Sequence, residues 1–268
     1  MPEVKRVLII AKTYPELSSK YVETVCTAAV DEQGKPYRLY PIPYRYLSGP
    51  LQFGRYQWIE APLTKSADDS RPESFRIDVD RLQVGEVVPT TYDEWGRRRE
   101  FVFKSPDWIF SSMLSLQSAQ KLNGTSLAFI YPAEVRTVRI RRRDKLDQDS
   151  FKQKLDRFKA ENSAERDQLT LFDSLTPAEM KELQYIGERV SVEWICSDLD
   201  CAGHEMQILD WEICELARRE GSEAAKAKVE ELLCATYRTG FMLGNFNAYR
   251  HNFAIIGLWY PKRSEMLF

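Results

Sequence analysis

The sequence predicts an α+β fold: a β-rich, barrel-like N-terminal domain, a charged connector and a small α+β C-terminal domain. Short apolar runs separated by Gly and Pro fill residues 1–104, a spacing typical of small barrels and strongly bent sheets. A charged stretch with few apolar residues follows at about residues 142–180. Beyond it, two strand-like runs enclose two helix-like runs. We therefore expect domains over residues 1–141 and 181–268, joined by the connector 142–180.

The first domain is expected to consist mostly of strands. Residues 4–11 (VKRVLIIA) read as a buried strand, and residues 21–30 alternate between core-facing and outward-facing side chains. Gly34 can adopt the positive φ of a hairpin turn before a returning strand at 36–40. Apolar residues at helical spacing predict one helix, over residues 106–122. The further expected strands are residues 57–64, 74–79, 82–88, 100–104, 127–131 and 134–141.

The second half alternates between strand and helix patterns. Residues 151–160 have the pattern of one or two helical turns inside the connector. Residues 189–196 (RVSVEWIC) place alternate side chains on one face and predict a strand. Helices are expected over 205–219 and 222–237, separated by Gly221, and a buried strand over 253–260.

Composition places the chain among ordinary globular proteins, with 43% hydrophobic and 29% charged residues. No run of eighteen apolar residues is present, so no membrane span is expected. The N-terminus lacks a signal-peptide pattern, and the five cysteines lack the spacing of a disulfide framework. We therefore expect a cytoplasmic protein without a membrane partner.

Charge is distributed unevenly along the chain. Residues 1–143 contain 22 Lys and Arg against 17 Asp and Glu, a net charge of +5, whereas residues 144–268 contain 16 against 23, a net charge of −7. In the strand expected at 134–141, Arg139 and Arg141 share one face, Arg143 continues the row, and Arg136 lies nearby. Such a row suits the phosphate backbone and predicts binding to DNA or RNA. An edge strand kept soluble by charge is the alternative.

The pattern Cys196-x4-Cys201-x2-His204 brings together the ligand types that zinc prefers. These residues cross the loop that we expect after the strand 189–196. Cys214 is excluded if a helix begins near residue 205, because it would lie roughly 15 Å along the axis from His204. The fourth ligand would be Cys234, Cys26, His251 or an aspartate of the loop. Alternatively, the three residues are ordinary core and loop positions.

Several carboxylates crowd the same region, namely Asp198, Asp200, Glu205, Asp210 and Glu212. A metal-dependent nuclease needs carboxylates that converge on Mg²⁺, often with a lysine nearby. No lysine occurs between residues 182 and 225. Asp210 and Glu212 are two residues apart in the expected helix, so their side chains do not face one another. A nucleic-acid-processing enzyme, a nuclease or modifying enzyme centred on residues 196–212, is therefore the second hypothesis.

Inside the polar connector, the segment QLTLF contributes three large apolar residues to a tract that otherwise cannot bury itself. It resembles the bacterial sliding-clamp-binding motif, Gln-Leu-(Ser or Asp)-Leu-Phe. The matching residues are Gln168, Leu169, Leu171 and Phe172, and Thr170 replaces the usual Ser or Asp. The resemblance implies a partner, the sliding clamp, and a role in DNA replication or DNA repair. The alternative is a hook that folds back onto this protein's own core.

These observations lead to a first hypothesis, a DNA-associated accessory protein. Its β-rich basic domain would contact nucleic acid, and its connector would dock on the clamp.

Overall fold

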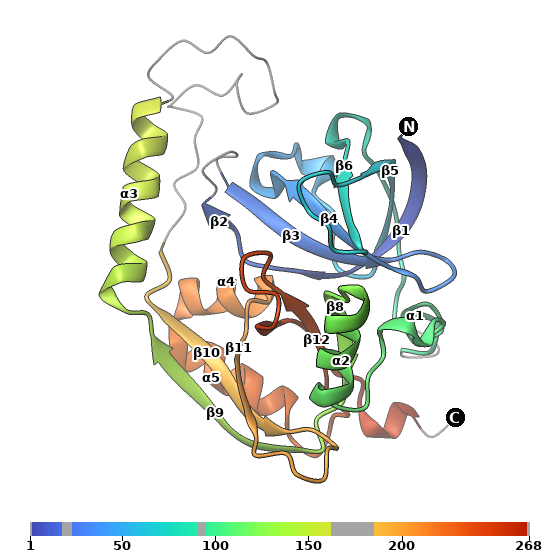
Figure 1. The fold of residues 1–268 in the computed structure, drawn as a ribbon, viewed down its shortest axis with the longest axis vertical. Helices are drawn as coiled ribbons and strands as arrows, with labels where there is room; N and C mark the ends of the chain where they lie inside the picture. Colours follow the sequence, from blue (N-terminus) through green and yellow to red (C-terminus); the bar gives the residue numbers. More distant parts are fainter. Residues whose placement is uncertain (1, 18–22, 91–94, 162–184, 267–268) are drawn as a thin grey trace.

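The computed structural model describes residues 2–17, 23–90, 95–161 and 185–266 (Figure 1). It confirms a mixed α+β fold with an N-terminal β-barrel. The segment Gln168–Phe172 lies outside the described residues. Within the described ranges, no helix is both long and apolar enough to cross a membrane.

Five strands close the N-terminal barrel. They follow the order β1-β3-β4-β6-β5, and β5 pairs back onto β1. All these neighbours are antiparallel except β4 and β6, which are parallel. The barrel strands are β1 (Glu3–Lys12), β3 (Glu23–Val30), β4 (Pro36–Ile42), β5 (Gln57–Lys65) and β6 (Ser74–Ile77). The short strands β2 (Glu16–Leu17) and β7 (Gln83–Val87) pair with β3 and β5.

The remaining strands form two three-stranded antiparallel sheets. One has the order β11-β10-β9 and the other the order β13-β12-β8. Their strands are β8 (Leu127–Ile130), β9 (Glu134–Arg142), β10 (Glu188–Ile195), β11 (His204–Gln207), β12 (Gly240–Asn245) and β13 (Phe253–Trp259). The helices are α1 (Gly96–Val102), α2 (Met113–Asn123), α3 (Lys145–Glu161), α4 (Trp211–Glu220) and α5 (Ser222–Leu232).

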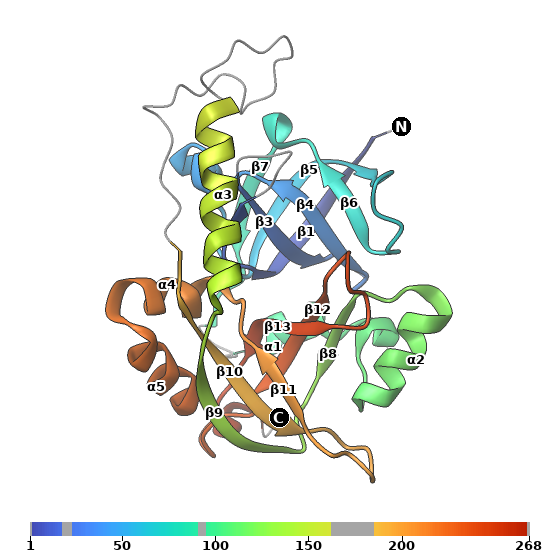
Figure 2. The same ribbon diagram turned by 60° about the vertical axis from the view of Figure 1, so that its left-hand side comes forward.

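The expected boundary at residue 141 is corrected by these pairings. β8 pairs with β12, and β9 pairs with β10 along almost its whole length. Both strands therefore belong with the C-terminal sheets, because each obtains its backbone hydrogen bonds there. The barrel strands end before α1, and Figure 2 shows the barrel above the two C-terminal sheets.

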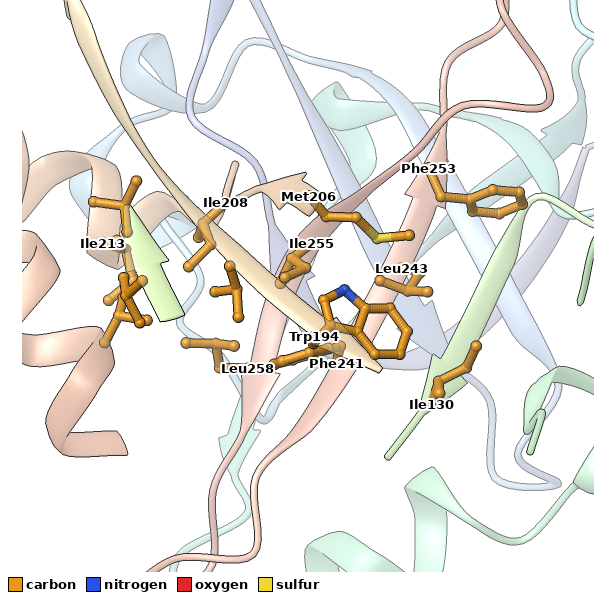
Figure 3. Close-up of a cluster of buried hydrophobic side chains, with 14 of the residues drawn as sticks. Ile130, Trp194, Met206, Ile208, Ile213, Phe241, Leu243, Phe253, Ile255 and Leu258 are labelled. Carbon is orange, nitrogen blue, oxygen red and sulfur yellow. The ribbon is translucent and has the colours of Figure 1, made fainter. Parts of the chain in front are cut away.

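A hydrophobic core fills the space between the two three-stranded sheets and α5 (Figure 3). Trp194 of β10 lies at its centre with 0% exposure, and its ring meets Phe241 of β12 edge-on at 5.3 Å. Ile208, Ile213 and Ile255 extend the cluster toward α4. This core fixes the inner face of β10, so the alternate side chains of that strand point outward.

A second core joins the barrel to the sheet β13-β12-β8. Leu8, Ile10 and Trp58 from the barrel pack against Phe129 and Trp259 from that sheet. Backbone hydrogen bonds from Tyr14 to Leu209 and from Leu209 to Ile255 tie the same parts together. The barrel and the C-terminal part of the chain thus share buried surface and backbone pairing.

Several expected elements are wrong in type or extent. The helix expected over residues 106–122 is the helix α2, which begins only at Met113, and the helix expected over 222–237 ends at Leu232. Residues 100–104 end the helix α1 instead of forming a strand, and residues 204–207 form β11 instead of beginning a helix. Pairing with β10 decides the conformation of residues 204–207, since tertiary context overrides local propensity. β12 has no counterpart in the expected elements, and α3 is longer than the one or two turns expected.

Candidate metal centre

The hairpin of β10 and β11 brings Cys196, Cys201 and His204 together. Cys196 directly follows β10, and His204 opens β11 opposite Trp194. The imidazole Nε2 lies 3.3 Å from Cys196 Sγ and 3.2 Å from Cys201 Sγ, and the two sulfurs are 3.5 Å apart. All three atoms lie within 4.8 Å of one another, so this group could hold a metal ion.

These spacings are close to those of a metal-ligand set. Tetrahedral zinc, with Zn–S near 2.3 Å and Zn–N near 2.0–2.1 Å, holds its ligand atoms about 3.5–3.8 Å apart. Both thiols are free, and their 3.5 Å separation is far longer than a disulfide of about 2.05 Å. The triangle would have to expand by only a few tenths of an ångström to hold zinc.

The pKa shifts of His204 and Cys201 favour metal binding, whereas the pKa shift of Cys196 opposes it. Burial lowers the pKa of His204, against the opposing effect of Asp198, so the imidazole is neutral and able to donate a lone pair. Burial acts to raise the pKa of Cys201, but hydrogen bonds from Cys196 and Gly203 outweigh it and lower that pKa. Burial raises the pKa of Cys196. Because thiolates are the ligands, binding would release thiol protons.

Neighbouring side chains hold the loop in place. The ring of Trp194 lies 4.9 Å from the imidazole of His204 and is itself fixed in the core. Ser197 Oγ donates to the Ser111 carbonyl at 2.5 Å, and Asp198 Oδ2 accepts from the Leu114 backbone N–H at 3.2 Å. The loop is thereby tied to the first turn of α2.

Gly203 makes the tight return from Cys201 to His204 possible. Its φ of +108° lies in a region that L side chains rarely adopt. A Cβ at this position would also lie 3.0 Å from Arg136 Nη1. The backbone conformation therefore favours glycine, and a Cβ would also require the exposed end of Arg136 to shift.

Among the candidates for a fourth ligand, the loop aspartate is the best placed. Asp198 Oδ2 lies 3.1 Å from Cys196 Sγ. Cys26 lies in the barrel, where its sulfur accepts from Arg38, and Cys234 is exposed beyond α5. Cys214 is buried in α4 and donates to the Ile208 carbonyl, so its exclusion holds although the helix begins later than expected.

Two family models match the chain. Residues 3–104 match a Domain of unknown function (DUF8758), and residues 109–268 match a Domain of unknown function (DUF8757). The chain belongs to the DUF8757 family. No curated protein matches it. The gap between the two matches lies just after α1, and all three ligand residues lie in the DUF8757 part.

The acidic residues of this DUF8757 part do not converge. Glu205 forms two hydrogen bonds with Arg141, whereas Asp210 caps α4 by accepting from the Glu212 and Ile213 backbone N–H groups. Asp210 also lies 3.4 Å from Arg55. Glu212 lies 3.3 Å from the same Nη1 atom of Arg55, so Asp210 and Glu212 share this arginine, whereas Glu205 is held separately by Arg141.

The arginine row of β9 is paired with carboxylates of the neighbouring strands. Arg139 donates to Glu193 at 2.9 Å, and Arg136 lies 3.9 Å from the same carboxylate. Arg141 binds Glu205. These arginine side chains are 40–55% exposed, on the outer face of the sheet.

Arg143 departs from the expected row. It follows the end of β9, is 20% exposed and packs 4.6 Å from the Tyr185 ring centroid. The alternation expected through Arg143 stops because β9 ends at Arg142 and the chain turns into α3.

Proposed function

We propose that this chain is a zinc-containing, DNA-associated accessory protein that docks on the replication sliding clamp. The convergence of Cys196 Sγ, Cys201 Sγ and His204 Nε2 carries the zinc assignment. Zinc at this hairpin would cross-link β10, β11 and the intervening loop, and metal-binding free energy would add to folding stability.

A structural role for zinc is favoured over a catalytic one. Glu205 is next to His204 in the sequence, and neighbouring side chains of a strand point to opposite faces. Glu205 accordingly binds Arg141 and Ser191 and cannot act as a base beside the metal. Asp198, held by the α2 backbone, is the residue that we assign to the fourth position.

Elemental analysis of protein purified without a metal-affinity step tests the zinc assignment. About one zinc per chain is expected, and a chelator should lower the melting temperature. Cys201→Ser should abolish zinc retention, whereas Cys234→Ser, an exposed cysteine outside the group, should retain it. Asp198→Ala should weaken retention. Metal well below one equivalent per chain, together with no effect of chelator, would mean that the three residues are ordinary core and loop positions without a metal.

Clamp docking is supported by the match of Gln168, Leu169, Leu171 and Phe172 to the clamp-binding pattern. The segment follows α3 in a polar part of the sequence, and an extended peptide can anchor through two apolar residues. Burial of a Leu and a Phe contributes roughly 1.5–3 kcal/mol each, part of which is offset by ordering.

Isothermal titration of a bacterial clamp with a peptide of residues 160–180 tests the docking without the folded domains. Replacing both Leu171 and Phe172 by Ala should cost several kcal/mol, about 2 or more per anchor. The matched control Thr170→Ser should bind as well as the native peptide. Absence of binding by the native peptide would remove the clamp assignment and leave the zinc assignment standing.

A further inference from the structure

A pocket of about 160 Å³ lies at the end of β10 away from the cysteines. Its walls come from four places: the segment 14–16, the first turns of α3, residues 185–190 and the segment 208–217. Figure 2 shows α3 rising above β9 and β10, with α4 near its lower end. The pocket is therefore separate from the group formed by Cys196, Cys201 and His204.

Both guanidinium groups that line the pocket retain unused donors. Arg189 is 18% exposed, donates to Gln207 Oε1 at 2.7 Å and lies 3.7 Å from Glu16. Arg143 donates to Asp147 Oδ2 at 3.2 Å. A guanidinium carries five N–H donors. Among the described residues, most donors of these two arginines therefore have no acceptor.

The pocket lining contains three cations and three carboxylates, namely Glu16, Asp147 and Glu188, so an anion would bind through the guanidinium donors that these carboxylates leave unpaired. Burial, followed by the charge of Arg143, lowers the pKa of Arg189, and both arginines line the pocket. Glu188 lines the pocket, but its carboxylate accepts from Arg142 and Ser222. Lys154 of α3 adds a further positive charge to the lining.

Part of the pocket lining is apolar. It is formed by Val190, Ile208, Leu209, Ile213 and Ala217. Cys214 also lines the pocket, but burial raises the pKa of its thiol to about 12, which makes it unreactive as a nucleophile. The lining thus suits binding of an amphiphilic molecule and no covalent chemistry.

We propose that this pocket binds a small organic carboxylate, with the carboxylate against Arg143 and Arg189 and an apolar body against the β10–α4 wall. Arginine forks recognise carboxylates through paired, charge-assisted hydrogen bonds. A cavity of about 150 Å³ lined by apolar side chains holds benzene, so the body of the ligand is about the size of one aromatic ring. The proposal does not depend on zinc or on the clamp.

Titration of the full chain with phenylacetate, followed by calorimetry and thermal melting, tests the proposal. Phenylacetate should bind saturably and raise the melting temperature, and the neutral analogue phenylacetamide should not. Arg189→Gln and Arg143→Gln should each weaken phenylacetate binding by about tenfold or more. Arg76→Gln, on the barrel strand β6 and 42% exposed, is the control with equal loss of charge and should bind like the native protein.

A second variant separates loss of the site from loss of the fold. Ala217→Leu fills the apolar wall and keeps both arginines, so it should block phenylacetate while leaving the melting temperature of the free protein close to native. Binding of inorganic phosphate as tightly as phenylacetate would contradict the apolar half of the proposal. Failure of phenylacetate and of branched-chain carboxylates such as 4-methylpentanoate to bind at millimolar concentration would overturn it, as would undiminished binding by the Arg143→Gln, Arg189→Gln double variant.

Discussion

Gly203, between two ligands of the proposed zinc site, provides a single-residue test of the hairpin. Gly203→Ala places a Cβ 3.0 Å from Arg136 Nη1 at a φ of +108°. A strained backbone of this kind costs of order 1–3 kcal/mol. We expect a lower melting temperature and weaker zinc retention, measured by thermal melting and metal competition.

Gly49→Ala is the control for that substitution. A Cβ at Gly49 meets nothing within 4 Å, so its stability should change by no more than about 0.5 kcal/mol. Equal changes in stability from the two substitutions would show that the positive φ of Gly203 imposes no particular cost on alanine.

The environment of Asp69 predicts that the folded state loses stability in acid. Its burial acts to raise the pKa, but hydrogen bonds from Arg71 and Ser74 outweigh it and lower the pKa of Asp69 to about 2. The folded-state pKa is thus below the unfolded value of about 3.8. The resulting stabilisation is present above about pH 4 and is lost as the pH falls through about 2.

Asp69→Asn isolates this contribution. The free energy of unfolding of native protein should exceed that of the variant at pH 6, and the difference should shrink between about pH 4 and pH 2. Urea unfolding across this range measures it. A difference that is constant with pH would show that the charge of Asp69 contributes nothing.

At the scale of elements, the exposed face of β9, β10 and β11 is a ladder of opposite charges. Arg136, Arg139 and Arg141 alternate with Glu193 and Glu205, so these five residues carry a net charge of only +1. Exposed ion pairs contribute only about 0–1 kcal/mol each. The phosphates of a nucleic acid can therefore replace the glutamates as partners of these arginines. Any nucleic-acid binding through this face should therefore be weak and strongly dependent on salt.

Replacing those three arginines by Gln tests this surface. Affinity for a DNA duplex should fall, and the dependence of affinity on salt should become less steep, as measured by fluorescence anisotropy. The triple variant Arg76→Gln, Arg81→Gln, Lys121→Gln removes equal charge elsewhere and should have a smaller effect. Equal losses in both variants would mean that net charge alone governs binding and that the β9 row has no special role.

Local patterns predicted most strands, because alternation and apolar runs are properties of the strand itself. β1, β5, β9, β10 and β13 were predicted within a few residues for this reason. β12 contains Gly240 and Gly244, which weaken a strand pattern, and both lie where a neighbouring side chain fills the space that a Cβ would occupy. Its strand character comes from pairing with β8 and β13, which no local pattern records.

The candidate site likewise combines features that local sequence patterns predict with features that only the fold creates. Cys196, Cys201 and His204 were predicted because they are near one another in the sequence. The pairing of the arginine row with Glu193 and Glu205 could not be predicted, since it depends on the register between strands that are far apart in the chain. The pocket beside α3 likewise combines four distant segments.

At the scale of the molecule, Arg55 links the barrel to the C-terminal part. Its side chain is 7% exposed, donates to the Leu258 carbonyl and lies 3.4 Å from Asp210, which is 2% exposed. Removing one partner of a buried ion pair typically costs 3–5 kcal/mol. Arg55→Met should therefore destabilise the whole chain by about that amount, measured by urea unfolding.

Arg6→Met is the surface comparison for this junction. Arg6 is 34% exposed and pairs with Glu32 and Glu86 on the barrel surface, so its loss should cost about 1 kcal/mol or less. A similar small cost for Arg55→Met would show that the junction does not depend on this ion pair.

The pairing of β8 with β12 has a consequence for synthesis on the ribosome. All four residues of β8 (Leu127–Ile130) are buried in the folded protein, yet their hydrogen-bonded partner is Gly240–Asn245, far later in the chain. The barrel strands and the β9–β10–β11 sheet, including the Cys196–His204 loop, can all form before that partner emerges. A nascent chain therefore carries an unpaired apolar strand until β12 and β13 are made, and this interval is when the protein is most exposed to aggregation.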